Sequence, residues 1–176
     1  MCDVFSPPSN RHRRFRRRRQ EPLARKVGRA LALPVYEIDS VARSVSDSRD
    51  FHGSNKEAKG VAFDLFWSFA RANLENGNSL VLDQNMGRAD QWSSIERVLA
   101  TVPGAEGLVF ILDCPYDLCV ARFAGRTEHP DLDEVNIHEH KYKWDYLNDN
   151  AFPEAIRIDA TQLEEEVFEE VMSHLG

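Results

Sequence analysis

The fold of this chain is decided by the stretch LARKVGRALALPVYEID, residues 23–39. Its first half places apolar residues at helical spacing: Leu23, Val27, Ala30 and Leu31. Its second half, LPVYEID (33–39), predicts a short strand that ends in Asp39. A helix followed directly by a short apolar strand is typical of one unit of a parallel sheet.

The same alternation of helix and strand continues to the end of the chain. Further strands are predicted at 79–85 (SLVLDQN), 107–113 (GLVFILD) and 154–161 (EAIRIDAT). Helices are predicted at 23–31, 55–77, 89–104, 115–126, 131–149 and 162–175, and a polar connection at 44–54. Uninterrupted apolar strands between helices predict an α/β fold, a doubly wound parallel sheet with helices on both faces. A fifth strand is expected before the helix at 23–31, and no credible one is written there.

Charge divides the chain into two parts. Residues 1–20 hold seven arginines and one acid, whereas the whole 176-residue chain has 22 basic and 29 acidic residues and a net charge of −7. We therefore treat residues 1–21 as an aberrant, disordered Arg-rich segment and residues 22–176 as one domain. Because that domain is acidic, nucleic-acid binding is an open but less favoured alternative, confined to the arginine run.

Three cysteines and the absence of a long apolar run indicate the expected environment. No run of about 18 apolar residues occurs, so no transmembrane helix and no membrane partner are predicted. The cysteines form neither a disulfide framework nor a CxxC pair, which favours a reducing cytoplasm. Cys114 and Cys119 are interpreted as small apolar core residues.

Three predicted strands end in aspartate: Asp39, Asp83 and Asp113. In a parallel sheet such ends lie at one edge, where a carboxylate can hold Mg²⁺ through water or accept a proton from a hydroxyl. The alternative is that each caps the following helix or turn. We favour capping for Asp113 and chemistry for Asp39 and Asp83.

Three arginines follow these strand ends. Arg88 lies in a strand-to-helix loop, where it could clamp an anion or remain solvated. Arg122 and Arg126 are four residues apart on one predicted helix face and would repel each other unless an anion or acid lies between them. That partner is either a transferred phosphoryl group or the acids Glu128, Asp131 and Asp133.

With these pieces in order, the chain resembles the P-loop kinase-like NTPases, in particular the zeta-toxin-like and polynucleotide-kinase-like ATPases that carry an AAA-type label. The resemblance is carried by 23–39, SLVLDQNMGRADQW (79–92), VFILDCPYDLCVARFAGRTEHPD (109–131), HKYKWDYL (140–147) and IRIDAT (156–161). It implies a nucleoside-kinase-like fold with a lid around 122–150, the cofactors ATP and Mg²⁺, and a small-molecule or nucleotide-like acceptor.

The resemblance also implies a role for each candidate residue. Asp39 would activate the acceptor hydroxyl, and Arg122 and Arg126 would act on the transferred phosphoryl group from the lid. Asp83 would be the Walker-B-like aspartate near magnesium, and Arg88 would lie at the acceptor site.

One departure from that family is serious. The family needs G-x-x-x-x-G-K-[ST] directly before the helix at 23–31, and here the sequence is RRFRRRRQEP (13–22), without glycine or lysine. If CGN codons encode the arginines and the coding DNA is read one base later, the new codons encode Gly, Ala, Asp or Val. In the same shifted frame, the codons of Gln20 and Glu21 can encode Lys and Ser. The phosphate loop is therefore absent or frameshifted, and the alternatives are an active phosphotransferase, a non-catalytic relic, or a protein with an RNA-binding arm.

Overall fold

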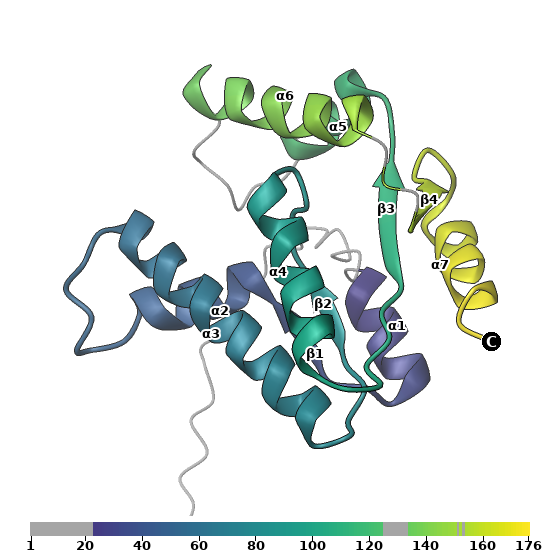
Figure 1. Ribbon diagram of the computed structural model, residues 1–176. Coiled ribbons are helices and arrows are strands. Elements are labelled where there is room, and N and C mark those ends of the chain that lie inside the picture. Colours follow the sequence, from purple (N-terminus) through teal and green to yellow (C-terminus); the bar gives the residue numbers. More distant parts are fainter. Residues whose placement is uncertain (1–22, 125–133, 151, 153) are drawn as a thin grey trace, which may run out of the picture.

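The structure, a computed structural model, describes residues 23–124, 134–150, 152 and 154–176. The expectations for residues 1–21 and for Arg126 therefore lie outside the described residues. The elements follow one another in the order α1 (Leu23–Leu31), β1 (Val35–Glu37), α2 (Ile38–Ser46), α3 (Asn55–Glu75), β2 (Val81–Asp83), α4 (Ala89–Thr101), β3 (Val109–Asp113), α5 (Tyr116–Ala124), α6 (Glu134–Asp149), β4 (Ala155–Asp159) and α7 (Glu164–Ser173) (Figure 1).

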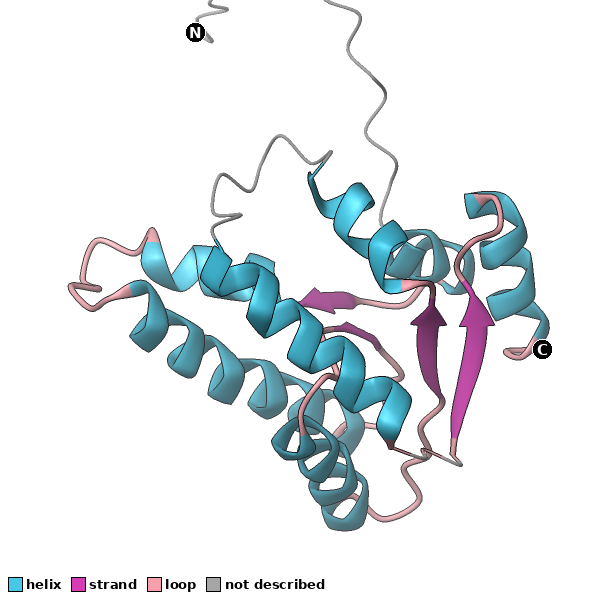
Figure 2. Ribbon diagram, turned by 90° about the horizontal axis from the view of Figure 1, so that it is seen from above, coloured by secondary structure: helices cyan, strands magenta, loops and turns pink. Residues whose placement is uncertain are grey.

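The four strands form two parallel pairs. β1 pairs with β2 in the register Val35 to Val81, and β3 pairs with β4 in the register Val109 to Ala155. The predicted α/β class with parallel strands is confirmed. Instead of one doubly wound sheet, however, the described strands form two separate two-stranded sheets, and Figure 2 shows the two pairs lying apart.

Helices cover both faces of the first sheet. Successive strand residues point to opposite sides, and each side contacts a different helix. On one side Val35 packs closely on Gly28 of α1, where an added Cβ would lie 2.1 Å from the valine Cγ2. On the other side Tyr36 stacks on Phe69 of α3, with ring centroids 5.9 Å apart. A three-residue strand thus separates two helical layers.

The main core lies where both sheets meet α1 and α7. Its buried members are Val27, Ile158, Val167 and Val171, and half-buried residues from β2, β3 and β4 pack against them: Val81, Phe110 and Ile156. Because residues of both strand pairs join one apolar cluster, the two sheets share a core on this face although they are not hydrogen-bonded to each other.

Residues 38–46 are a helix, which the sequence analysis did not predict. The strand predicted at 33–39 ends at Glu37, and Ile38 begins α2. Apolar Ile38, Val41, Ala42 and Val45 have helical spacing, but the intervening serines suggested a polar connection. Packing between α2 and α3 favours the helix over that local preference.

α3 has well-formed signals at both ends. Ser54 and Glu57 make a reciprocal capping box, in which each side chain accepts a hydrogen bond from the backbone N–H of the other residue. At the other end Gly77 adopts a φ of 74° and donates its N–H to the Leu74 carbonyl, which confirms it as the helix stop. None of the described helices combines the length and apolar composition needed to cross a bilayer.

Candidate active site

Each described strand ends in an acidic residue, and the pairing brings these ends together in twos. Glu37 of β1 lies opposite Asp83 of β2, and Asp113 of β3 lies opposite Asp159 of β4. Since the strands of each pair are parallel, both acids of a pair lie at the same carboxyl edge. Such edges are where ligands bind in open α/β sheets.

At the first edge, Arg25 of α1 forms a two-pronged ion pair with Glu37. Its Nε donates to Oε1 at 2.6 Å and its Nη2 donates to Oε2 at 2.5 Å, while the Ser40 hydroxyl also donates to Oε2. These contacts, with the Arg25 hydrogen bond foremost, hold the pKa of Glu37 below its ordinary value. The pKa of Arg25 is raised, mainly by Glu37 and with a smaller contribution from the charge of Asp83.

The structure corrects the placement of Asp39. The strand-end carboxylate beside Asp83 is Glu37, and Asp39 lies exposed in the first turn of α2. The strand ends two residues earlier than the sequence suggested, and Ile38 already belongs to α2. Asp83 does end its strand as predicted, and it is exposed.

Arg88 lies in the strand-to-helix loop as predicted, at the residue before α4 begins. That loop is shaped by side chains: Asn85 accepts a hydrogen bond from the Gly87 N–H at 2.8 Å, and the Trp92 indole donates to the Met86 carbonyl at 2.9 Å. Lys143 of α6 packs closely on Gly87: a Cβ added to Gly87 would lie 2.4 Å from the Cβ of Lys143. α6 therefore covers the loop that follows β2.

At the second edge, Asp113 bridges the two strands instead of capping a helix. Its carboxylate accepts a hydrogen bond from Arg157 Nη1 at 2.9 Å, and the same guanidinium donates to the Leu147 carbonyl at the end of α6. Because α5 begins only at Tyr116, Pro115 and not Asp113 is the residue before the helix.

The loop after β4 is held by Asp159 and Arg122. Asp159 Oδ1 accepts from both the N–H and the hydroxyl of Thr161, at 2.8 and 2.7 Å, and these bonds lower the pKa of Asp159. Arg122 of α5 donates to the Ala160 carbonyl at 2.6 Å, and the Ala160 N–H donates to the Asp113 carbonyl. Arg122 therefore reaches this second edge, whereas its predicted companion Arg126 lies outside the described residues.

A cavity of about 390 Å³ opens at the carboxyl ends of β3 and β4. Its lining includes Asp113, Cys114, Trp144, Asp159 and Thr161, and Trp144 Nε1 donates to the Cys114 carbonyl at 3.0 Å. This volume lies within the usual range of small-molecule sites, and it combines one indole with carboxylates and a hydroxyl. A second, open hollow of about 470 Å³ runs along α1 beside Arg25, Gly28 and Val35.

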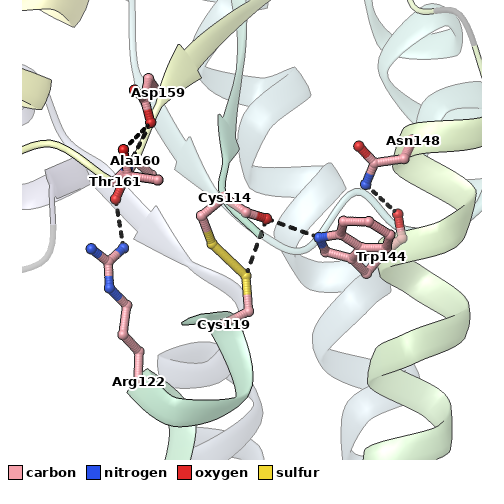
Figure 3. Close-up of a disulfide and its surroundings, with 8 residues drawn as sticks. All are labelled: Cys114, Cys119, Arg122, Trp144, Asn148, Asp159, Ala160 and Thr161. Carbon is pink, nitrogen blue, oxygen red and sulfur yellow. Dashed lines mark hydrogen bonds between the residues drawn. A yellow bond between two sulfur atoms is a disulfide. The ribbon is translucent and has the colours of Figure 1, made fainter. Parts of the chain in front are cut away.

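Cys114 and Cys119 are joined in a disulfide at the wall of this cavity (Figure 3). Their interpretation as unpaired apolar core residues is therefore wrong. The two residues are five apart in sequence, but the turn from β3 into α5 brings their Cα atoms within 6.6 Å. That distance is compatible with a bridge, and sequence spacing alone did not reveal it.

Several residues of these two edges were not predicted from the sequence, among them Arg25, Glu37, Trp144, Arg157 and Asp159. A usable signal existed for Asp159, because AIRID (155–159) ends in an acid like the other strands. Within the described residues, no group of three or more His, Cys, Asp or Glu side chains is arranged to hold a metal ion. Any divalent cation here would need further oxygen ligands from a substrate or water.

Two solved crystal structures are similar to this chain. One is a candidate kinase from Chloroflexus aurantiacus, with a TM-score of 0.64 and 16% identity over 87% of each chain. The other is an unliganded sugar kinase from a Janibacter species, with a TM-score of 0.62 and 15% identity, covering 87% of this chain and 85% of that one. No protein-family model matches the chain, and neither does any curated protein. At these identities the likeness shows a shared fold.

Proposed function

We propose that this protein has the fold of an ATP-dependent phosphotransferase that moves a γ-phosphoryl group to a hydroxyl of a small-molecule or nucleotide-like acceptor. The observation that carries the proposal is the pairing of acidic strand ends at two carboxyl edges, with Arg25 and Arg157 bound to two of the four acids. Both similar structures are named as kinases, which favours the same class of reaction.

In this proposal the nucleotide binds at the second edge, at the carboxyl ends of β3 and β4. The cavity there has the volume for a base, Trp144 supplies an aromatic surface, and Arg122 lies close by on the Ala160 carbonyl. Arg122, together with Arg126, would stabilise charge that develops on the transferred group. A bound ATP would supply the phosphoryl group.

The first edge, in this proposal, serves the metal and the acceptor. Asp83 is exposed at the strand end, and one carboxylate with phosphate and water oxygens suits Mg²⁺. Glu37 is engaged by Arg25, so its charge is already neutralised. Asp39 would accept the proton of the acceptor hydroxyl, and Arg88 would orient the acceptor.

Residues 11–22, where a phosphate-binding loop would lie, do not fit a bound triphosphate. Residues 11–22 contain no glycine and no lysine, so they lack the backbone freedom and the cation with which a phosphate loop surrounds a triphosphate. We therefore expect the chain as written to bind Mg·ATP weakly and to transfer phosphate slowly. This makes a non-catalytic relic of the same fold the second candidate function.

A calorimetric titration with Mg·ATP tests the proposal on two proteins: this chain, and a version whose residues 11–21 are replaced by a sequence containing GSGGAGKS. Binding that appears only in the second protein, followed by ATP consumption with a panel of hydroxyl acceptors, supports the phosphotransferase. Binding without consumption supports the relic. If the restored protein also fails to bind nucleotide, the kinase interpretation of residues 23–176 is wrong. Salt-sensitive RNA binding that is lost on deleting residues 1–20 would support the arm instead.

A further inference from the structure

We propose that Cys114 and Cys119 are a redox-active modification site: a reversible disulfide, formed by exchange with a low-molecular-weight disulfide, that determines how α5 and Arg122 are held on the 159–161 loop. This inference concerns the chain without nucleotide and does not depend on the proposed phosphotransferase activity.

The bridge spans the short turn that connects the end of β3 to α5. Cys114 directly follows β3, and Cys119 lies in the first turns of α5, where its N–H donates to the Pro115 carbonyl. Both residues are partly exposed, so a small thiol or disulfide can reach them. The disulfide therefore fixes the start of α5 to the end of the strand (Figure 3).

A closed circuit of contacts leads from the bridge back to its own strand. Arg122 lies three residues after Cys119 on the same helix, and its guanidinium binds the Ala160 carbonyl at 2.6 Å. The Ala160 N–H in turn donates to the carbonyl of Asp113, the residue before Cys114. In this circuit the disulfide adds a second covalent link between strand and helix, beside the backbone at Cys114 and Pro115, while the other two steps are single hydrogen bonds.

The bridge also touches the cavity wall. Cys114 lines the cavity, and its carbonyl accepts the hydrogen bond from Trp144 Nε1. Opening the disulfide removes a constraint from one wall, and the start of α5 gains freedom relative to β3. We expect the contact between Arg122 and Ala160 to open more often, together with the contact between Trp144 and Cys114.

The chemistry is a two-step exchange. One cysteine thiolate attacks a sulfur of oxidised glutathione, forming a mixed disulfide and releasing one glutathione thiolate. The second cysteine then attacks the protein sulfur of that mixed disulfide, which forms the Cys114–Cys119 bond and releases the second glutathione. Two protein thiols are oxidised, one glutathione disulfide is reduced to two thiols, and the two thiol protons leave to water or to the glutathione thiolates.

The experiment uses the full chain with Cys2→Ser, so that only Cys114 and Cys119 can react. The protein is equilibrated in glutathione buffers from fully reduced to fully oxidised, quenched by alkylation and weighed by mass spectrometry. We expect a loss of two mass units without a stable glutathione adduct, reversed by dithiothreitol. Hydrogen exchange is then followed in both forms, and reduction should speed exchange at the Ala160 amide and the Trp144 indole N–H several-fold.

Two matched variants keep the test sharp. Cys114→Ser with Cys119→Ser, in the Cys2→Ser background, should exchange like the reduced form in every buffer. Arg122→Met in the same background should keep the disulfide but lose the redox dependence of exchange at Ala160. The proposal is overturned if the thiols stay reduced in oxidised glutathione or end as glutathione adducts. It is equally overturned if the bridge forms and exchange at Ala160 is the same in both states.

Discussion

Glu37 and Asp83 occupy matching positions of β1 and β2, and Arg25 from α1 binds Glu37 through Nε and Nη2. The charge of Asp83 also contributes to the raised pKa of Arg25. Two carboxylates side by side would repel each other, and the arginine offsets that repulsion. The first carboxyl edge is thus a charge cluster of two acids and one arginine, built from three elements of secondary structure.

This cluster predicts a specific pH dependence of stability. Because the pKa of Glu37 is lowered in the folded state, its contribution is present at neutral pH and is lost as the pH falls below its ordinary value of 4.5. Urea unfolding of the wild-type chain and Glu37→Gln should differ most at pH 7, with the variant less stable. The two curves should converge as Glu37 of the wild type becomes protonated. A constant difference from pH 7 to pH 3 would contradict this role.

Because α1 lies in close contact with β1, adding a single methyl group at Gly28 should lower the free energy of unfolding. Gly28→Ala places its Cβ against Val35 and should destabilise the fold by about 1–3 kcal/mol. Gly60→Ala is the matched control, since its Cβ meets nothing within 4 Å in α3 and should stabilise by about 0.5–1 kcal/mol. Thermal or urea unfolding of both variants measures the contrast, and a neutral Gly28→Ala would show that α1 can move away from β1.

Ile158, which is fully buried in β4, tests the core shared by the two sheets. Ile158→Ala should lower the free energy of unfolding by about 2–5 kcal/mol, because a cavity opens in the shared core. Leu163, 71% exposed before α7, is the control, and Leu163→Ala should change stability by less than about 0.5 kcal/mol. Equal effects of the two changes would contradict the burial of Ile158 in the shared core.

The placement of Asp39 and Glu37 predicts different activity defects in the chain with a restored phosphate loop. Asp39→Asn should abolish phosphoryl transfer and leave Mg·ATP binding unchanged, because only the proton acceptor is lost. Glu37→Gln should retain transfer, since Glu37 is already neutralised by Arg25. Steady-state rates and calorimetry on both variants separate these outcomes. Full activity of Asp39→Asn with an inactive Glu37→Gln would move the catalytic role to the strand end.

The alternation of helices and strands was predictable because hydrophobic periodicity is a local property of the chain. All four strands lie within their predicted ranges, and six of the seven described helices coincide with predicted ones. α2 was missed because its serines obscured four apolar residues whose burial depends on α3. Asp83 and Arg88 were placed correctly because each depends only on where one strand ends and the next helix begins.

The hydrogen-bond partners of the arginines were not predictable, because these bonds join residues that are distant in sequence. Arg25 and Glu37 are 12 residues apart, Arg122 and Ala160 are 38 apart, and Asp113 and Arg157 are 44 apart. Which acid or carbonyl each arginine reaches depends on strand register and on the helix that covers the edge. A pattern of residue types contains neither of these.

By itself, therefore, the sequence determined the α/β class, the order of the elements, the acids near the strand ends and the absence of a phosphate-binding motif in residues 11–22. Only the tertiary structure decided that the strands form two pairs, that Glu37 lies beside Asp83, and that Cys114 bonds Cys119. The physical reason is that side-chain periodicity and turn chemistry act over a few residues. Register, charge pairing and sulfur proximity arise only when separate elements pack together.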